Sequence, residues 1–354
     1  MKVGLSGEFL RRPWTGSGQY TLHLAAQLRQ LLGDQQVVLL GQGTGRPLAK
    51  LWWEQVGVVR AARAAGVELL HVPYFGPPLR SPLPLVVTVH DLIMLALPEH
   101  RGPLLYRLYT HLALVGAQRA DLVLADSAAT ARDLTRRGGI ASARIAIVPL
   151  GYDERLAEPV SSEAVERYRT QRGLPPSFVL YLGGFDARKN VPLLLRAAQR
   201  GGWPLVIAGA PPPPRPPLYP SLPTTSARVH WLGRVAEEEK PLLYRAASLF
   251  CYPSRYEGFG LPVLEAMACG VPVVAAAATS IPEVVGEAAV LVPPDDELAL
   301  VEAVTALLGD SERRAELAEQ GQARARQFSW ERTARETLAA YQRVLSHAPA
   351  RVVG

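Results

Sequence analysis

The chain has 354 residues, of which 48% are hydrophobic and 20% are charged, and its formal net charge is +6. This length exceeds what one hydrophobic core usually spans, so two domains are expected. No stretch approaches the roughly 20 apolar residues of a transmembrane helix, and the residues after Met1 lack the apolar core of a signal peptide. We therefore expect a cytoplasmic protein without a membrane-spanning segment.

The positive charge is concentrated in the first half. Residues 1–155 hold 17 Lys and Arg against 11 Asp and Glu, whereas residues 156–354 hold 21 of each. The arginines considered are Arg11, Arg12, Arg101, Arg107, Arg132, Arg136 and Arg137. This excess predicts contact with an anionic membrane surface or a phosphate-bearing acceptor. A general preference for Arg, which outnumbers Lys 34 to 4, is the alternative, and no nucleic-acid binding is expected.

In the first half, short Val-, Leu- and Ile-rich runs alternate with segments of helical spacing. Strands are predicted at 2–5, 37–40, 67–72, 85–89, 122–125 and 145–148, and helices at 16–32, 103–120 and 127–137. Continuous apolar strands that alternate with helices are typical of a parallel sheet covered on both faces. The first half is therefore expected to be one doubly wound α/β domain.

The second half repeats this plan. Strands are predicted at 178–182, 205–208, 229–232, 249–252, 273–276 and 289–292, and three helices follow from residue 295 to residue 346. Two Rossmann-like domains, 1–155 and 156–328, are expected to face each other across a cleft, with a C-terminal helix in 329–354 that packs back across both. Pro211–Pro223 has eight prolines in thirteen positions, which predicts an exposed polyproline-like loop.

A glycine loop follows the first predicted strand and opens a helix. Gly16, Ser17 and Gly18 lack the rest of the dinucleotide fingerprint, because Thr21 occupies the third glycine position and no acidic residue closes the second strand. An NAD-dependent oxidoreductase is therefore disfavoured. The loop predicts an approach to phosphate or to an acceptor, and a plain helix-start turn is the alternative.

Two histidines lie at the ends of predicted strands. His90 comes directly after the run 85–89, so it is expected at the carboxyl edge of the sheet, where ligands of such domains bind. We interpret it as a hydrogen-bonding partner of a sugar hydroxyl. His71, which is followed by Pro73 in an apolar surround, favours a packing role.

The segment 183–190 follows a strand and precedes a helix, and it carries two adjacent cations. Arg188 offers a planar fork of donors and Lys189 a mobile point charge, the groups that bind a diphosphate. Lys189 is one of only four lysines in an Arg-rich chain. A phosphate contact is therefore predicted, with a surface pair at a helix start as the alternative.

The segment 254–270 places Glu257 and Glu265 eight positions apart around a glycine loop. The spacing alone carries little weight, since Glu158 and Glu166 share it. Gly258 and Gly260 allow the backbone to bend close to a ligand, and Pro262 suits the first position of a helix. Free amides at such a helix start favour an anion, and the carboxylates can accept hydrogen bonds from sugar or ribose hydroxyls.

Other motifs are weaker or absent. Arg234 and Val235 follow a predicted strand, where a nucleobase can stack, but an ordinary strand-to-helix turn fits equally well. Metal-ligand motifs, the serine-hydrolase motif and the Walker loop are absent, so no metal or other cofactor is expected. Cys251 and Cys269 lie in apolar runs and are interpreted as buried, inert thiols.

Together these motifs resemble the retaining glycosyltransferases of family 4, which have the GT-B fold. The resemblance covers nearly the whole chain. Within the family, the chain is most similar in pattern to bacterial mannosyltransferases. It implies that Glu257 contacts the donor sugar, Glu265 the ribose, Lys189 and Arg188 the diphosphate, and His90 a sugar hydroxyl. The further donor-binding positions that it implies are Gly184, Gly258, Phe259, Gly260, Leu261, Arg234 and Val235, with Gly16, Ser17 and Gly18 near phosphate and acceptor. One departure is Gly184, where many members have Arg.

The resemblance implies transfer of a hexose with retained anomeric configuration, by front-side attack and without a protein nucleophile. Mannose from GDP-mannose is favoured over glucose or another sugar from UDP, and the acceptor is expected to be a glycan or a lipid-linked acceptor. Three alternatives stay open: a sugar-nucleotide epimerase of the same fold, an NAD-dependent oxidoreductase, and a non-catalytic protein that senses nucleotide sugars.

Overall fold

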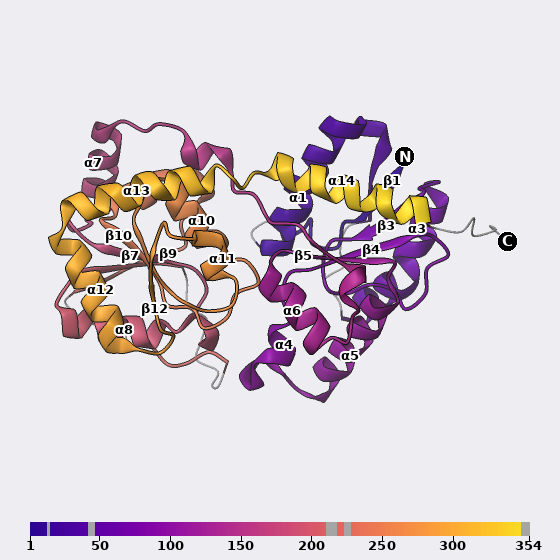
Figure 1. Ribbon diagram of the computed structural model, residues 1–354, viewed down its shortest axis with the longest axis horizontal. Helices are drawn as coiled ribbons and strands as arrows, with labels where there is room; N and C mark the ends of the chain where they lie inside the picture. Colours follow the sequence, from indigo (N-terminus) through magenta and orange to yellow (C-terminus); the bar gives the residue numbers. More distant parts are fainter. Residues whose placement is uncertain (13–14, 42–46, 210–217, 223–227, 348–354) are drawn as a thin grey trace. The chain divides into compact units, whose positions relative to one another are not determined.

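The computed structural model describes residues 1–12, 15–41, 47–209, 218–222 and 228–347. The chain forms two compact units (Figure 1). Unit 1 contains Met1–Gly151 and the chain from Trp330 onward, and unit 2 contains Tyr152–Ser329. The sequence placed these divisions after residues 155 and 328. The predicted polyproline-like loop, Pro211–Pro223, lies mostly outside the described residues.

Unit 1 is built on a six-stranded parallel sheet in the order β2-β1-β3-β4-β5-β6. Its strands are β1 (Val3–Ser6), β2 (Val37–Leu40), β3 (Leu69–Val72), β4 (Leu85–Val89), β5 (Leu122–Ala125) and β6 (Ile145–Ile147). The winding direction reverses between β1 and β3. The four central strands are buried along their whole length, which explains why their sequences are continuous apolar runs.

The helices of unit 1 connect these strands, apart from the terminal helix. They are α1 (Gly16–Leu32), α2 (Pro47–Trp52), α3 (Val58–Ala64), α4 (Ile93–Ala96), α5 (Leu104–Arg119), α6 (Ala128–Arg136) and α14 (Trp330–His347), with a π-helical turn (Trp53–Gly57) between α2 and α3. The predicted helices 16–32, 103–120 and 127–137 correspond to α1, α5 and α6. The first half of the chain is thus a doubly wound α/β unit, as predicted.

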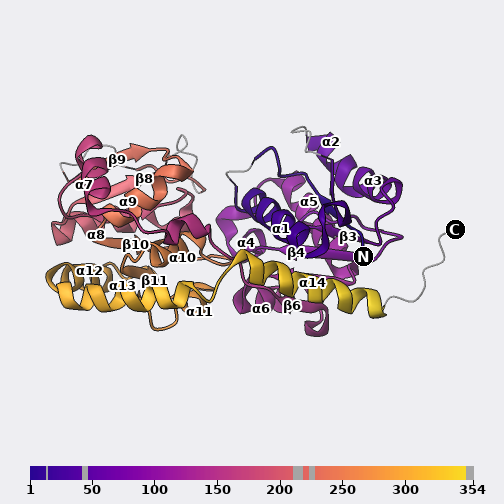
Figure 2. The same ribbon diagram turned by 90° about the horizontal axis from the view of Figure 1, so that it is seen from above.

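The terminal helix α14 is part of unit 1. That it packs across both domains stays a prediction. It runs beside α1 in both views (Figures 1 and 2). Three contacts fix it there: Tyr341 Oη lies 2.6 Å from His71 Nδ1, Thr333 Oγ1 donates to the Pro149 carbonyl at 2.7 Å, and the Trp330 ring stacks on the ring of His23. Its buried face is therefore complementary to unit 1.

Unit 2 has a second six-stranded parallel sheet, in the order β12-β11-β10-β7-β8-β9. Its strands are β7 (Val179–Leu182), β8 (Leu205–Ala208), β9 (Val229–Gly233), β10 (Leu249–Tyr252), β11 (Val273–Ala276) and β12 (Val290–Val292). This is the order of the dinucleotide-binding fold, and the winding reverses between β7 and β10. Ligands of such sheets bind at the carboxyl ends of the strands beside that reversal.

The helices of unit 2 are α7 (Ser162–Gln171), α8 (Val191–Gly201), α9 (Lys240–Ala246), α10 (Leu261–Ala268), α11 (Ile281–Val285), α12 (Glu297–Gly309) and α13 (Ser311–Ala325). Helix α8 packs against α12, and α10 packs against α13. Within the described ranges of both units, no helix combines the length and the apolar character needed to cross a membrane.

Candidate active site

The loops that leave β7 and β10 meet where the winding of unit 2 reverses. Lys189 ends a short 3-10 turn (Ala187–Lys189) after β7, and Glu257 lies in the loop between β10 and α10. The two residues are buried and paired, with Lys189 Nζ 2.6 Å from Glu257 Oε1. Arg188 Nη1 lies 2.7 Å from the other carboxylate oxygen, Oε2. The structure thus brings three predicted site residues into one cluster.

Surrounding groups hold this cluster in place. Ser254 Oγ donates to Glu257 Oε1 at 2.6 Å, and Lys189 Nζ also donates to the hydroxyl of Tyr252 at the end of β10. The Arg188 guanidinium donates to the Tyr256 carbonyl at 2.9 Å, and its Nε lies 3.0 Å from Asp186 Oδ1. Both cations are therefore oriented before any ligand arrives.

Burial and charge oppose each other at this cluster. Burial alone disfavours the carboxylate of Glu257, but Arg188 and Lys189 outweigh that effect and lower the pKa of Glu257 to about 2. Burial and the neighbouring Arg188 charge lower the pKa of Lys189, against the pull of Glu257. The cluster consequently contains two closely spaced cations. An entering dianion can bind both of them and replace the carboxylate of Glu257 as their partner.

Helix α10 starts directly after the Glu257 loop. Gly260 caps it with a φ of 107°, and a Cβ at this position would lie 2.5 Å from Ile281 Cδ1, so only glycine fits. The amides of Phe259, Gly260 and Leu261 donate no hydrogen bond within the described part of the chain. Three backbone donors at a helix N-terminus form a site for an anion. Pro262 occupies the second position of the helix, whereas the sequence predicted the first.

Glu265 lies further along α10 in a separate cluster. Tyr244 of α9 donates to Glu265 Oε2 at 2.9 Å, and Lys240 Nζ, at the start of α9, lies 3.4 Å from Oε1. Burial raises the pKa of Glu265, while Lys240 and Tyr244 lower it. The sequence interpretation missed Lys240 and Tyr244. The rarity of lysine, which pointed to Lys189, would have pointed to Lys240 as well.

In unit 1, His90 follows β4 as predicted. Its Nδ1 lies 2.8 Å from Asp126 Oδ2, and Asp126 is buried directly after the neighbouring strand β5. The Tyr20 ring of α1 packs edge-on against the imidazole, with ring centres 4.9 Å apart. Burial lowers the pKa of His90, but Asp126 overcomes this and raises it above its usual value. Asp126 was missed, although it too follows a predicted strand.

The glycine loop before α1 is explained in part by packing. Thr15 caps α1 and accepts from the Gly18 amide at 3.2 Å, and a Cβ on Gly18 would lie 2.2 Å from the Arg12 carbonyl oxygen. Gly16, in contrast, has open space where a Cβ would be, and Ser17 is half-buried. Gly18 is therefore required by local geometry. The role of this loop near phosphate or acceptor stays a prediction.

Three further predicted positions are Gly184, which lies beside the Lys189 cluster, and Arg234 and Val235, which do not contact it. A Cβ on Gly184 would be 3.9 Å from Lys189 Cε, so space for a side chain is present beside the lysine. Arg234 is exposed and Val235 half-buried after β9, which β8 separates from β7. The structure does not bring Arg234 or Val235 into hydrogen-bond contact with the cluster.

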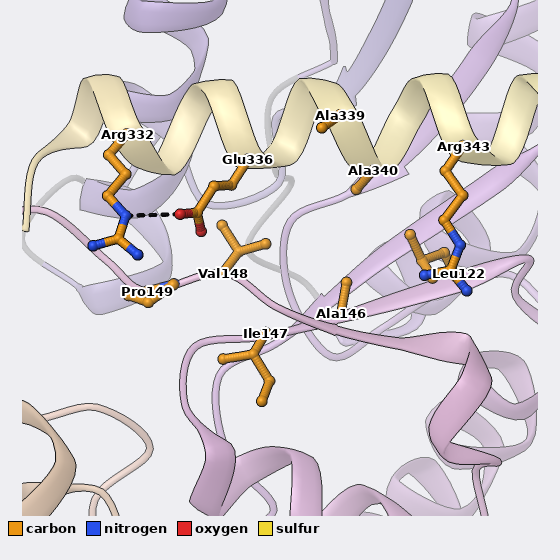
Figure 3. A pocket seen from close by; sticks show the side chains of 10 residues that line it. All are labelled: Leu122, Ala146, Ile147, Val148, Pro149, Arg332, Glu336, Ala339, Ala340 and Arg343. Atoms are coloured by element: carbon orange, nitrogen blue, oxygen red, sulfur yellow. Dashed lines mark hydrogen bonds and ion pairs between the residues drawn. The ribbon is translucent and has the colours of Figure 1, made fainter.

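A groove of about 500 Å³ lies elsewhere, between α14 and the edge of the unit 1 sheet (Figure 3). Arg332 donates to Glu336 one turn further along α14 at 2.7 Å. It contains none of the predicted site residues. Among the residues that the structure describes, no group of three or more His, Cys, Asp and Glu side chains is arranged to hold a metal. That the protein needs no metal or other cofactor stays a prediction.

The chain was compared with known proteins. Residues 14–156 match the family described as Glycosyltransferase Family 4, and residues 164–324 match the Glycosyl transferases group 1. The chain is 30% identical to O-antigen chain mannosyltransferase B of Escherichia coli, over 97% of this chain and 100% of that protein. It is 32% identical to the MMP alpha-(1->4)-mannosyltransferase of Mycolicibacterium hassiacum, over 83% and 72% of the two chains.

Two solved structures have the same fold. Sucrose-phosphate synthase of Thermosynechococcus elongatus superposes with a TM-score of 0.76 at 23% identity, over 98% of this chain and 100% of that one. HepE of Anabaena, solved in complex with UDP-glucose, superposes with a TM-score of 0.74 at 21% identity, over 97% and 100%. These likenesses support the GT-B fold of two Rossmann-like units. The chain therefore belongs to glycosyltransferase family 4 and is a glycosyltransferase.

Proposed function

We propose that this glycosyltransferase moves mannose from GDP-mannose to a glycan or lipid-linked acceptor, with retention of the anomeric configuration. The two relatives described above are named as mannosyltransferases and match most of this chain. The observation that carries the proposal is the Lys189, Arg188 and Glu257 cluster beside the free amides of α10. Cations and helix amides at one point suit a diphosphate, and the carboxylate suits a sugar.

In this proposal the donor diphosphate takes the place that Glu257 holds on the two cations. Lys189 and Arg188 then bind phosphate oxygens, together with the amides of Phe259 and Gly260. Glu257, released from its ion pairs, accepts hydrogen bonds from hydroxyls of the donor sugar. The paired Glu265 and Lys240 bind the ribose hydroxyls. Until the donor arrives, Arg188 and Lys189 keep Glu257 ionised, because they lower its pKa.

The transfer step breaks the bond between the sugar C1 and the phosphate oxygen, and its electron pair leaves with the diphosphate. Lys189, Arg188 and the α10 amides stabilise the negative charge that grows there, because they are already oriented. The acceptor hydroxyl attacks C1 from the face that the leaving group vacates. Its proton passes to the departing phosphate oxygen, so no protein nucleophile is needed.

His90 and the acceptor complete the proposal. Asp126 orients the His90 imidazole and favours its protonated form, which can donate to a sugar hydroxyl. A lipid-linked acceptor and the basic first half support a reaction at the inner face of the cell membrane.

A panel of nucleotide sugars tests this function. We expect GDP release to be fastest from GDP-mannose and to depend on an added acceptor such as an alkyl mannoside. GDP release without an acceptor would favour a sugar-nucleotide epimerase, and the absence of turnover across the whole panel would favour a non-catalytic sensor. Faster release of UDP from UDP-glucose would change the donor and leave the family assignment intact.

A further inference from the structure

Helix α5 exposes its bulky apolar side chains. Leu104, Leu105 and Leu108 are 67%, 80% and 56% exposed, and Tyr106 is 41% exposed. The buried residues of the helix are instead small: Thr110, Ala113, Gly116 and Ala117. This is the reverse of a core-facing amphipathic helix, in which the large apolar residues face inward. The other exposed large hydrophobic residues in the described chain lie on other elements, and no more than two of them, Leu48 and Trp52 of α2, share one.

The small face of α5 is held close to the rest of unit 1. A Cβ on Gly116 would lie 2.7 Å from the Pro77 carbonyl oxygen, so the helix backbone packs directly on that loop. Tyr109 donates to Glu54 Oε1 at 3.0 Å and accepts from Lys50 Nζ at 3.0 Å. These contacts fix the rotation of α5, and its leucines cannot turn inward without breaking them.

The exposed face continues into a groove of about 420 Å³ between α4 and α5, which are adjacent in Figure 1. Its apolar lining comes from both helices: Met94, Leu95, Leu104, Leu108 and Leu114. Arg101, Arg107 and His111 also line it, and the segment 101–120 contains no acidic residue. An apolar strip flanked by cations is complementary to a lipid surface that has acyl chains below anionic headgroups.

We propose that this α5 face, formed by Leu104, Leu105, Leu108 and Arg107 together with Arg101 just before the helix, docks the protein on an anionic phospholipid bilayer. The leucines enter the boundary between headgroups and acyl chains, and the arginines bind lipid phosphates. The inference rests on the proposed function, because a lipid-linked acceptor is held at such a surface. It names the surface that makes the contact, where the sequence indicated only the basic first half.

Vesicle co-sedimentation of the full chain tests the proposal. We expect the wild-type protein to bind vesicles of phosphatidylcholine with phosphatidylglycerol, and to bind pure phosphatidylcholine vesicles more weakly. The triple variant L104Q/L105Q/L108Q should lose about tenfold or more in apparent affinity, since apolar insertion supplies part of the binding. The variant R101A/R107A should lose roughly fivefold per arginine for anionic vesicles alone. Glutamine is a good helix former, so α5 should survive.

Leu298→Gln is the matched control, because Leu298 is 50% exposed on α12 in unit 2. It should bind vesicles like the wild type. The proposal is overturned if the wild type fails to bind anionic vesicles, or if the L298Q and triple variants lose affinity equally. It is also overturned if light scattering shows a wild-type dimer that the triple variant abolishes, because a second copy then covers this face.

The proposed function is read separately, from transfer to a water-soluble alkyl mannoside. We expect the α5 variants to retain wild-type rates in that assay while losing vesicle binding. Vesicle binding without any transfer would refute the proposed function and leave the docking surface standing. Transfer without vesicle binding would refute the docking surface and leave the proposed function standing.

Discussion

Three of the four lysines in this chain lie in clusters of the same composition, each with a glutamate and a tyrosine. Lys189 contacts Glu257 and Tyr252, and Lys240 shares Glu265 with Tyr244. The third, Lys50, contacts Glu54 and Tyr109. Lysine carries a compact charge on a flexible stem, whereas arginine carries a rigid planar fork. In a chain with 34 arginines, these positions use the cation that can move to a new partner.

Glu257→Gln is expected to lower transfer by two orders of magnitude or more, on the order of the loss of one preorganised polar group in an active site. The substitution also leaves Lys189 and Arg188 without their shared carboxylate, so we expect a loss of about 3–5 kcal/mol in the free energy of unfolding. Initial rates and urea unfolding measure the two effects. Glu166→Gln, which affects an exposed pair with Arg169, should change neither. Wild-type activity of the Glu257 variant would refute the assigned role.

The same residue sets an acid limit. The pKa of Glu257 is about 2 in the folded protein and 4.5 when the chain is unfolded. The stabilisation that the ionised Glu257 gives the fold is therefore present above pH 4.5 and is lost as the pH falls toward 2. The wild type should therefore lose more stability than Glu257→Gln across that window. Parallel curves would contradict this.

Lys189→Ala is expected to weaken binding of GDP itself by roughly 10- to 100-fold, because charge-assisted hydrogen bonds to phosphate are lost. Isothermal titration with GDP and with guanosine measures the effect. Guanosine, which has no phosphate, should bind the variant and the wild type alike. Lys2→Ala is the control. Lys2 donates a hydrogen bond to the Ala65 carbonyl and belongs to unit 1, not to the unit that holds the cluster. Equal GDP affinities of the wild type and Lys189→Ala would remove phosphate binding from Lys189.

At the scale of elements, the candidate site is made by loops that follow parallel strands. The sequence predicted these loops well, because each lies between an apolar run and a helix and carries Gly, Lys or Glu. It did not predict the groups that reach Glu265 and His90 from other elements. Lys240 and Tyr244 come from α9, and Asp126 directly follows the strand next to that of His90. Their proximity depends on strand order, which local patterns do not specify.

The same limit applies to the π-helical turn and to α14. The turn at Trp53–Gly57 buries Glu54 against Tyr109, a contact between residues far apart in sequence. The sequence predicted the helix that is α14, but it did not indicate which residues of unit 1 the helix packs against. The partners that decide this, such as His71, lie at the other end of the chain.

The loop before α1 offers a paired test. Gly18→Ala is expected to cost about 1–3 kcal/mol in unfolding free energy, because its Cβ would overlap the Arg12 carbonyl and force the backbone to move. Gly16→Ala meets open space and should be nearly neutral. Thermal unfolding of both variants measures the difference. If both variants were equally destabilised, close packing at Gly18 would not explain the glycine.

His71 joins three elements and should make unit 1 sensitive to acid. It contacts Thr88 of β4 and Tyr341 of α14, and burial lowers its pKa to about 3. Below about pH 6.5 the unfolded chain binds a proton at His71 that the folded chain does not bind. The free energy of unfolding therefore decreases as the pH is lowered from about 6.5 to about 3.

This one group contributes a slope of at most about 1.4 kcal/mol per pH unit. His71→Gln should show a shallower decline by that amount in urea titrations between pH 6.5 and 4. His111→Gln, on an exposed residue of α5, should keep the wild-type slope. Identical slopes for the wild type and His71→Gln would contradict the buried neutral state.

At the scale of the whole molecule, the chain combines two Rossmann-like units with different contents. Unit 2 holds the Lys189 cluster and the free amides of α10, which suit a nucleotide sugar. Unit 1 holds His90 with Asp126 and the exposed apolar face of α5. The chain passes between the units twice, after Gly151 and after Ser329. This division gives each unit a separate experimental readout: GDP affinity for unit 2, and vesicle binding for unit 1.

The most direct test of the account is the product formed from GDP-mannose and an alkyl mannoside, analysed by NMR at the anomeric position. We predict GDP release that is matched by a new mannosyl linkage with the α configuration of the donor, and Glu257→Gln should form it at least about 100-fold more slowly. A product with the β configuration would contradict retention. GDP-mannose that stays intact with every acceptor, while other nucleotide sugars react, would contradict the proposed donor.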